Sequence, residues 1–264
     1  MSNVPHPSDR IDEVSDAYEP AKKIDDVCRI LFYLLVPLSL LVLFPKWFGE
    51  LGELILKVAF LLLTVLLFAL FLVAKLYLIP SAERLRRKQL LSDAFETILT
   101  PEVTKRYYNN SYEPSHQRLA ANIMENAFFG SNVTSSMLRR VRFKCGTYLL
   151  VWLGALAFRQ TSMDIVLWIT QLVFSVDIIA YWVSLEVLRV RHQRVYDDLY
   201  QHFLHAHDQS TSKGVASILD IFATYESNKA IAGVLLDSKI FNKENPQLSG
   251  QWKVICGKIG IPLE

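Results

Sequence analysis

Two long apolar blocks, residues 30–79 and 143–188, constrain the fold of this 264-residue chain more than any other feature of its sequence. Polar residues at 45–53 and at 159–164 divide each block into two apolar segments. An α-helix needs about 20 largely apolar residues to cross a hydrocarbon core of about 30 Å. The pattern predicts four transmembrane helices in two short-looped hairpins. Two buried helical hairpins in a soluble protein are the alternative.

The four apolar segments are not equally suited to crossing a bilayer. The first reaches full length if residues 28–48 are counted, with a kink expected at Pro37, and the second covers 54–79. The third, 143–158, is short and would require local thinning of the bilayer, whereas the fourth, 165–188, is long enough.

Positively charged residues predict the orientation of these segments, because cytoplasmic loops are enriched in Lys and Arg. Lys46 and Arg159 are the only basic residues in the two predicted outer loops. Clusters of Lys and Arg lie instead within 84–88, 139–144 and 189–194. All three clusters border the ends of apolar segments that would face the same side. Both termini and the central segment are therefore predicted to be cytoplasmic.

The predicted fold class is an all-α integral membrane protein with four transmembrane helices as two hairpins and a helical cytoplasmic part. The predicted parts are a cytoplasmic N-terminal segment (1–28), transmembrane hairpin 1 (29–79), a cytoplasmic helical segment (80–142), transmembrane hairpin 2 (143–188) and a cytoplasmic helical C-terminal part (189–264).

Helical periodicity continues through the cytoplasmic parts. It predicts helices at about 81–99, restarted after Pro80, and at about 114–129, ended by the Gly-Ser-Asn sequence of 130–132. Two shorter helices are expected at about 215–236 and 248–259. No run with the period of a β-strand is present.

Polar residues inside the fourth apolar segment are candidates for a membrane pathway. At about 100° per residue, Thr170, Asp177, Tyr181 and Ser184 share a narrow stripe on one helical face. A carboxylate within a membrane usually faces a bundle interior or water, which makes Asp177 the most informative of the four. The stripe is predicted either to line a pore or to join helices by hydrogen bonds.

Sequence motifs give no support for catalysis. The chain contains no GxxxxGK[ST], GxSxG or GxGxxG pattern. His192, His202, His205 and His207 lie near one another, but a solvated helix face explains them better than a metal pair. We predict no enzymatic activity, no cofactor and no bound metal.

The central segment combines aromatic, amide and basic side chains within a short stretch. The candidates are Tyr107, Tyr108, Asn109, Arg118, Asn122 and Asn126. Aromatic rings stack on bases, amides read base edges, and arginine neutralises phosphate. This combination would suit a nucleotide, and it would equally suit a helix packed on a membrane surface.

Two short-looped hairpins around a cytoplasmic stretch, Tyr-Tyr-Asn-Asn at 107–110, Glu-Asn-Ala-Phe-Phe at 125–129 and a helical tail give the chain a family resemblance. It resembles the SMODS-associated four-transmembrane effectors of bacterial anti-phage systems. The resemblance implies an abortive-infection effector that binds a cyclic or linear oligonucleotide made by a partner synthase. On binding, the effector would form a homo-oligomer and permeabilise the bacterial inner membrane in which it lies. No duplex DNA or RNA partner is expected. A membrane-anchored adaptor with a cytoplasmic partner-binding part is the alternative.

Overall fold

The computed structural model describes residues 11–43, 49–157, 163–173, 179–205 and 211–263. The fold is all-α, as predicted. It also contains a pair of two-residue antiparallel strands that the sequence pattern did not predict. The elements are β1 (Ile11–Asp12), the 3-10 helix η2 (Glu13–Tyr18), α1 (Glu19–Leu43), α2 (Gly49–Val73), the π-helix η4 (Ala74–Leu78), α3 (Ile79–Phe95), β2 (Thr104–Lys105), α4 (His116–Ala157), α5 (Met163–Val173), α6 (Tyr181–Leu204), α7 (Ser212–Ala232) and α8 (Ser238–Ile259).

The chain forms two compact units, each made of discontinuous segments. Unit 1 contains residues 1–18, 80–137 and 185–264, and unit 2 contains residues 19–79 and 138–184. Helices α4 and α6 each contribute residues to both units.

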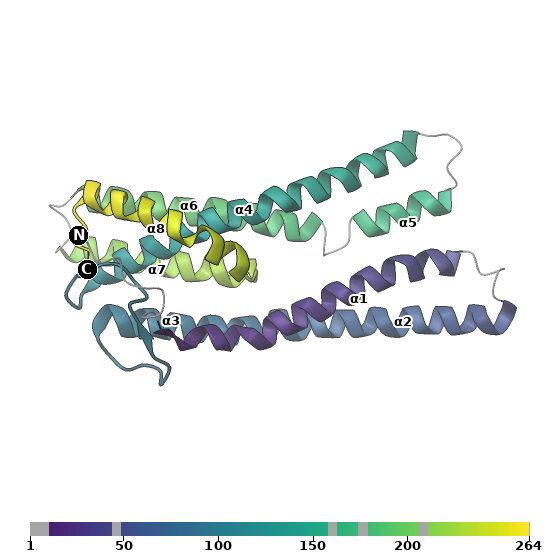
Figure 1. The fold of residues 1–264 in the computed structure, drawn as a ribbon, viewed down its shortest axis with the longest axis horizontal. Helices are drawn as coiled ribbons and strands as arrows, with labels where there is room; N and C mark the ends of the chain where they lie inside the picture. Colours follow the sequence, from purple (N-terminus) through teal and green to yellow (C-terminus); the bar gives the residue numbers. More distant parts are fainter. Residues whose placement is uncertain (1–10, 44–48, 158–162, 174–178, 206–210, 264) are drawn as a thin grey trace. The chain divides into compact units, whose positions relative to one another are not determined.

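The N-terminal half of α4 is the central helix of unit 1, and α3, α6, α7 and α8 contribute to the same core (Figure 1). Residues 119–131 are buried with the exception of Asn126. Most of them are apolar, and the buried polar residues Asn122 and Glu125 lie on one face of the helix. Ala120, Ala121 and Ala127 provide short side chains around which the neighbouring helices pack.

Helix α4 does not end at residues 130–132, so the predicted helix end there was wrong. Ser131 Oγ and Asn132 Nδ2 donate to the Phe128 carbonyl at 3.1 and 2.8 Å, and Thr134 Oγ1 donates to the Gly130 carbonyl at 2.6 Å. Polar side chains that favour turns are here bonded back onto their own helix. Gly130 has a packing role, because a Cβ atom at this position would lie 2.4 Å from His192 Nδ1.

The two C-terminal helices of unit 1 have well-defined caps. The Thr211 hydroxyl accepts from the Gly214 amide at 3.0 Å, and the Asp237 carboxylate accepts from the Lys239 and Ile240 amides. Gly233 and Gly260 follow α7 and α8 in the left-handed conformation. The second helix begins ten residues before the predicted start, and Pro246 lies inside it.

Unit 2 contains the hairpin of α1 and α2, to which α5 is attached. The Trp168 indole donates to Ser39 Oγ on α1 at 2.6 Å, and the Trp152 indole on α4 donates to Thr170 Oγ1 on α5 at 2.8 Å. Phe32 and Cys145 form a small buried cluster, and Leu67 of α2 is among the partly buried side chains that pack against it.

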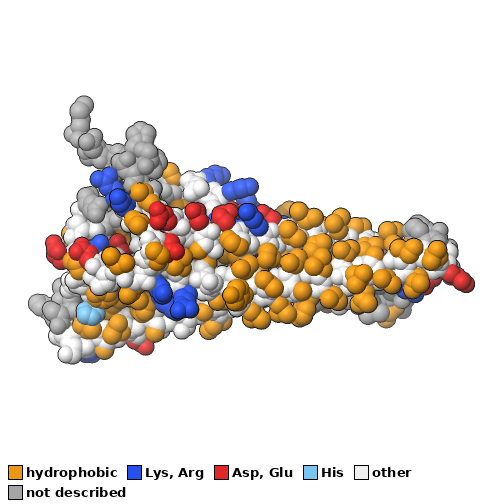
Figure 2. All heavy atoms as spheres, turned by 90° about the horizontal axis from the view of Figure 1, so that it is seen from below, with side chains coloured by type: hydrophobic (Ala, Val, Ile, Leu, Met, Phe, Trp, Pro, Cys, Tyr) orange, Lys and Arg blue, Asp and Glu red, His pale blue; other side chains and the backbone are white. Residues whose placement is uncertain are grey.

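Helix α2 leaves its apolar side chains exposed. No residue of α2 is buried, and Leu51 and Leu62 are 72% and 63% exposed. In Figure 2 hydrophobic side chains cover the face that α2 presents. Within the described residues, the continuous helix of residues 49–95 is the one that is long and apolar enough to cross a membrane by its length and composition. The other three predicted spans include residues 44–48, 158 or 174–178, which lie outside the described part of the chain.

The second predicted span continues into the next helix without a break at Pro80. Proline has no N–H to donate and its ring collides with the carbonyl four residues earlier in an α-helix. The π-turn η4 precedes the proline and makes room for its ring: the Ile79 amide donates to the Ala74 carbonyl, five residues earlier. The wider turn lets the helix run on through Pro80, and the expected restart was therefore wrong.

The contact between α4 and α6 predicts opposite effects for two glycine substitutions. In an unconstrained helix, Gly→Ala stabilises by about 0.5–1 kcal/mol. We expect Gly130→Ala instead to lower the free energy of unfolding by about 2 kcal/mol, because the new methyl group collides with the His192 ring. Thermal unfolding of the detergent-solubilised protein, followed by circular dichroism, measures the change.

Gly250→Ala on α8 is the matched control, since a Cβ atom there has no neighbour within 4 Å. This variant is expected to melt at or above the wild-type temperature. Combining Gly130→Ala with His192→Ala removes the colliding ring and should recover much of the loss. Equal melting of Gly130→Ala and wild type would contradict the close contact.

Candidate functional site

The predicted ligand-binding residues come together in unit 1, where their polar atoms bond to one another and to carboxylates. Asn126 Nδ2 donates to the Tyr108 hydroxyl at 2.9 Å. The backbone and side-chain amides of Asn109 both donate to Glu125, at 3.1 and 2.5 Å. These pairs join the loop before α4 to the central helix.

A second part of the same network connects α4 to the end of α3. Asn122 is fully buried, and its amide donates to Asp93 at 2.7 Å while its carbonyl accepts from Asn110 at 2.8 Å. The Arg118 guanidinium lies 3.3 Å from both Asp93 and Glu96. In this conformation, a ligand that binds these side chains would have to exchange internal hydrogen bonds for its own.

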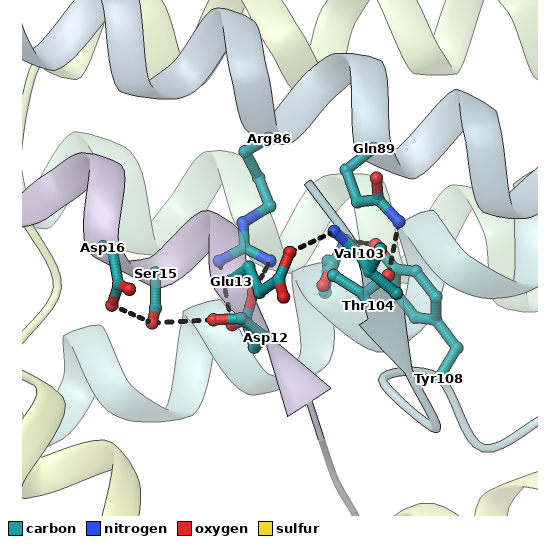
Figure 3. Close-up of polar contacts among 10 residues, drawn as sticks. Asp12, Glu13, Ser15, Asp16, Arg86, Gln89, Val103, Thr104 and Tyr108 are labelled. Atoms are coloured by element: carbon teal, nitrogen blue, oxygen red, sulfur yellow. Dashed lines mark hydrogen bonds and ion pairs between the residues drawn. The ribbon is translucent and has the colours of Figure 1, made fainter. Parts of the chain in front are cut away.

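Tyr107 differs from the other candidate residues, because its ring packs against a cation, Arg86, that sequence analysis did not identify as a site residue. The Arg86 guanidinium carbon lies 4.8 Å from the centre of the Tyr107 ring, and Tyr108 packs edge-on against the same ring at 4.9 Å. Arg86 also donates two hydrogen bonds to the two carboxylate oxygens of Asp12, both at 2.9 Å (Figure 3).

The predicted membrane stripe is only partly described. Asp177 lies outside the described residues. Thr170 lies on α5, where its hydroxyl donates to the Val166 carbonyl and accepts from the Trp152 indole. Tyr181 and Ser184 lie on α6. For Thr170, the described contacts are of the helix-joining kind, and pore lining by the stripe stays a prediction.

The histidines do not share a solvated helix face. His192 is 3% exposed, and the prediction of a solvated position was wrong for this residue. Its ring packs against the backbone of Gly130 and lies 5.7 Å from the Tyr225 ring. His205 is exposed, with its Nδ1 2.8 Å from the Gln201 carbonyl, and His207 lies outside the described residues.

Sequence analysis also missed a cluster of charged groups between α3 and α7. Lys229 is 14% exposed, and its ammonium lies 2.6 Å from Glu83 and 3.3 Å from Glu226. The hydroxyl of Tyr18 forms a hydrogen bond with Glu83. Glu226 and Lys229 are three residues apart in a helix, which could have suggested a local pair. Their partner Glu83 is remote in the sequence, and no pattern indicates it.

Burial and charge set the protonation states in this cluster. Burial lowers the pKa of Lys229, but Glu83 and Glu226 outweigh burial and raise it. Burial raises the pKa of Glu226, while Lys229 opposes that rise. Burial, followed by the positive charge of Lys229, lowers the pKa of His192 to about 4. Lys229 is therefore charged and His192 neutral at pH 7.

Comparison with known proteins gives no relative: no protein-family model, no curated protein and no solved structure matches this chain.

The buried neutral His192 predicts a loss of stability in acid. Its pKa is 6.5 in the unfolded chain and about 4 in the fold, so below pH 6.5 the unfolded state binds a proton that the folded state excludes. Lowering the pH from 7 to 5 should therefore cost about 2 kcal/mol of unfolding free energy through this residue. Chemical unfolding at the two pH values measures it.

His192→Gln should remove about that share of the pH dependence, because the amide does not titrate in this range. The exposed His205 provides the control, and His205→Gln should keep the wild-type pH dependence. An unchanged pH dependence in His192→Gln would mean that the protonation of other groups explains the acid sensitivity.

Proposed function

We propose that this chain is a four-span membrane effector that binds an oligonucleotide second messenger with unit 1, assembles into oligomers and permeabilises the bacterial inner membrane through unit 2. The observation that carries the proposal is the contrast between the units. Unit 1 buries an extensive core with a polar network, whereas α2 of unit 2 buries none of its side chains. Lipid is the environment that such an apolar, exposed helix requires.

Charge supports the proposed topology. The helix of residues 49–95 is free of charge from 58 to 74 and then carries Arg84, Arg86, Arg87 and Lys88. A second basic cluster lies at 139–144, next to the third proposed span. Both clusters adjoin unit 1 segments in the sequence, which supports a cytoplasmic unit 1.

The polar network supports ligand sensing by unit 1. A network whose hydrogen bonds link α3, α4 and the intervening loop has two ways to be satisfied: internally, or by a ligand that presents acceptors and donors of its own. A ligand that prefers one arrangement of these groups shifts the population toward it. Several chains are needed for a pore, because four helices with few polar residues enclose little water.

A membrane-anchored adaptor is the second candidate, and one observation favours it. Two polar side chains in unit 2, Ser39 and Thr170, each accept a hydrogen bond from a tryptophan of another helix. These contacts join helices and need no lumen.

The two candidates differ in what the purified protein does to a vesicle. Dye-loaded liposomes containing the full chain are expected to leak when one member of a panel of cyclic and linear oligonucleotides is added, and to stay sealed without it. Because a pore requires a polar lining, Asp177→Ala should reduce the leakage at least tenfold while binding of the active oligonucleotide is retained.

Thr64→Val is the control in the membrane part, because the Thr64 hydroxyl already donates to the Phe60 carbonyl of its own helix at 2.7 Å. This variant should leak like the wild type. Sealed vesicles with every oligonucleotide, despite correct insertion, would favour the adaptor. Turnover of a nucleotide or lipid by the purified protein would instead indicate an enzyme.

A further inference from the structure

The N-terminal strap, defined as β1 and η2 (Ile11–Tyr18), lies across the α3 side of unit 1 and is held there by specific contacts. β1 pairs with β2, and the Glu13 amide donates to the Val103 carbonyl at 3.3 Å. The Val103 amide returns a bond to the Glu13 carboxylate at 2.8 Å (Figure 3). The side chain of Val14, within the strap, is fully buried. The strap is therefore an ordered part of the unit.

The strongest polar contact of the strap is the pair formed by Asp12 and Arg86. Two parallel N–H···O bonds of 2.9 Å join the guanidinium to both carboxylate oxygens. The side chain of Arg86 is 15% exposed and that of Asp12 is 22% exposed, so the pair borders solvent. A guanidinium binds the two oxygens of a carboxylate or of a phosphodiester with the same fork geometry.

Around Arg86 the structure supplies the other group that a nucleotide site requires. The guanidinium lies over the Tyr107 ring, 4.8 Å from its centre, and this contact orients the guanidinium plane. Gln89 contributes an amide one helical turn away, bonded to Thr104 Oγ1 at 2.5 Å.

A charge pair joins the strap to this surface: Asp12 with Arg86. The strap contains Asp12, Glu13 and Asp16 and no basic residue. Arg86 on α3 is the cation that pairs with the strap, and further cations lie along the same segments: Arg84, Arg87 and Lys88 on α3, and Lys105 and Arg106 at and just after β2. If the strap leaves, its three acidic groups leave with it, while Glu83 remains neutralised by Lys229. The exposed surface would then favour an anion.

We propose that Arg86 on Tyr107 is the phosphate-binding position of unit 1, and that Asp12 occupies it as an internal substitute for a phosphodiester of the oligonucleotide ligand. The ligand and the strap compete for one guanidinium. Binding therefore displaces residues 11–18, and the displacement reaches Glu19, the first residue of α1, through the chain. This inference rests on the proposed function for the identity of the ligand, but not for the existence of the anion position.

Amide hydrogen exchange of the detergent-solubilised full chain tests the competition, with inorganic pyrophosphate as the probe and chloride at equal ionic strength as the reference. In the wild type, pyrophosphate should speed exchange in residues 11–18 by about tenfold without changing α8. Asp12→Asn should exchange fast without the probe and bind pyrophosphate about tenfold more tightly, because more of the population is binding-competent.

Two further variants make the outcome specific. Asp16→Asn removes an equal charge from the strap but only a 3.4 Å contact with Ser15, and should behave like the wild type. Arg86→Lys keeps the charge but cannot hold two oxygens in a fork, and should weaken pyrophosphate binding about tenfold. Equal pyrophosphate binding by Arg86→Lys and wild type would overturn the proposal, as would exchange in residues 11–18 that pyrophosphate leaves unchanged.

Leakage separates this inference from the proposed function. Strap release by pyrophosphate, with no oligonucleotide causing leakage, would retain the anion position and contradict the effector function. Oligonucleotide-gated leakage that is identical in wild type, Asp12→Asn and Arg86→Lys would retain the function and overturn the role of Arg86.

Discussion

The close approach of α6 to α4 at Gly130 is the contact on which unit 1 depends. It seats the His192 ring directly on the backbone of the central helix, which only a residue without a side chain allows. A helix that is enclosed on every side also has to bury its own polar residues. Asn122 and Glu125 are buried in this way, and each has partners on another segment. The polar network follows from the complete burial of the helix.

Hydrophobic periodicity was sufficient to predict the all-α class and the existence of most helices, because these depend on local patterns. It failed where a distant residue decides the local structure. The sequence of 130–132 reads as a helix end, yet the helix continues because its polar side chains bond back and because α6 requires the glycine. Pro80 reads as a boundary, yet a π-turn absorbs it. Tertiary packing overrode local preference in both places.

The candidate site was predictable to the extent that its members are neighbours in the sequence. The stretch from Tyr107 to Asn126 was identified from composition, and the structure does bring those residues together. Their partners could not be found in the same way, because Asp12 and Arg86 are 74 residues apart and Glu83 and Lys229 are 146 apart. Composition can indicate that charges exist, but it carries no information about which of them meet.

The ion pairs of unit 1 differ in how readily one partner can leave, and this difference decides which of them can act as a switch. Glu83 belongs to α3 and Lys229 to α7, so separating them means moving one helix away from the other, whereas Glu226 lies three residues before Lys229 on the same helix. Removing one partner of such a buried pair is strongly destabilising. Asp12 instead belongs to a two-residue strand outside the helices, which is held by the Arg86 pair, by pairing with β2 and by the burial of the neighbouring Val14. Arg86 can therefore change partners while every helix of the bundle stays in place. Asp93 and Glu96 lack that property, because they end α3 or directly follow it and pair with the central helix.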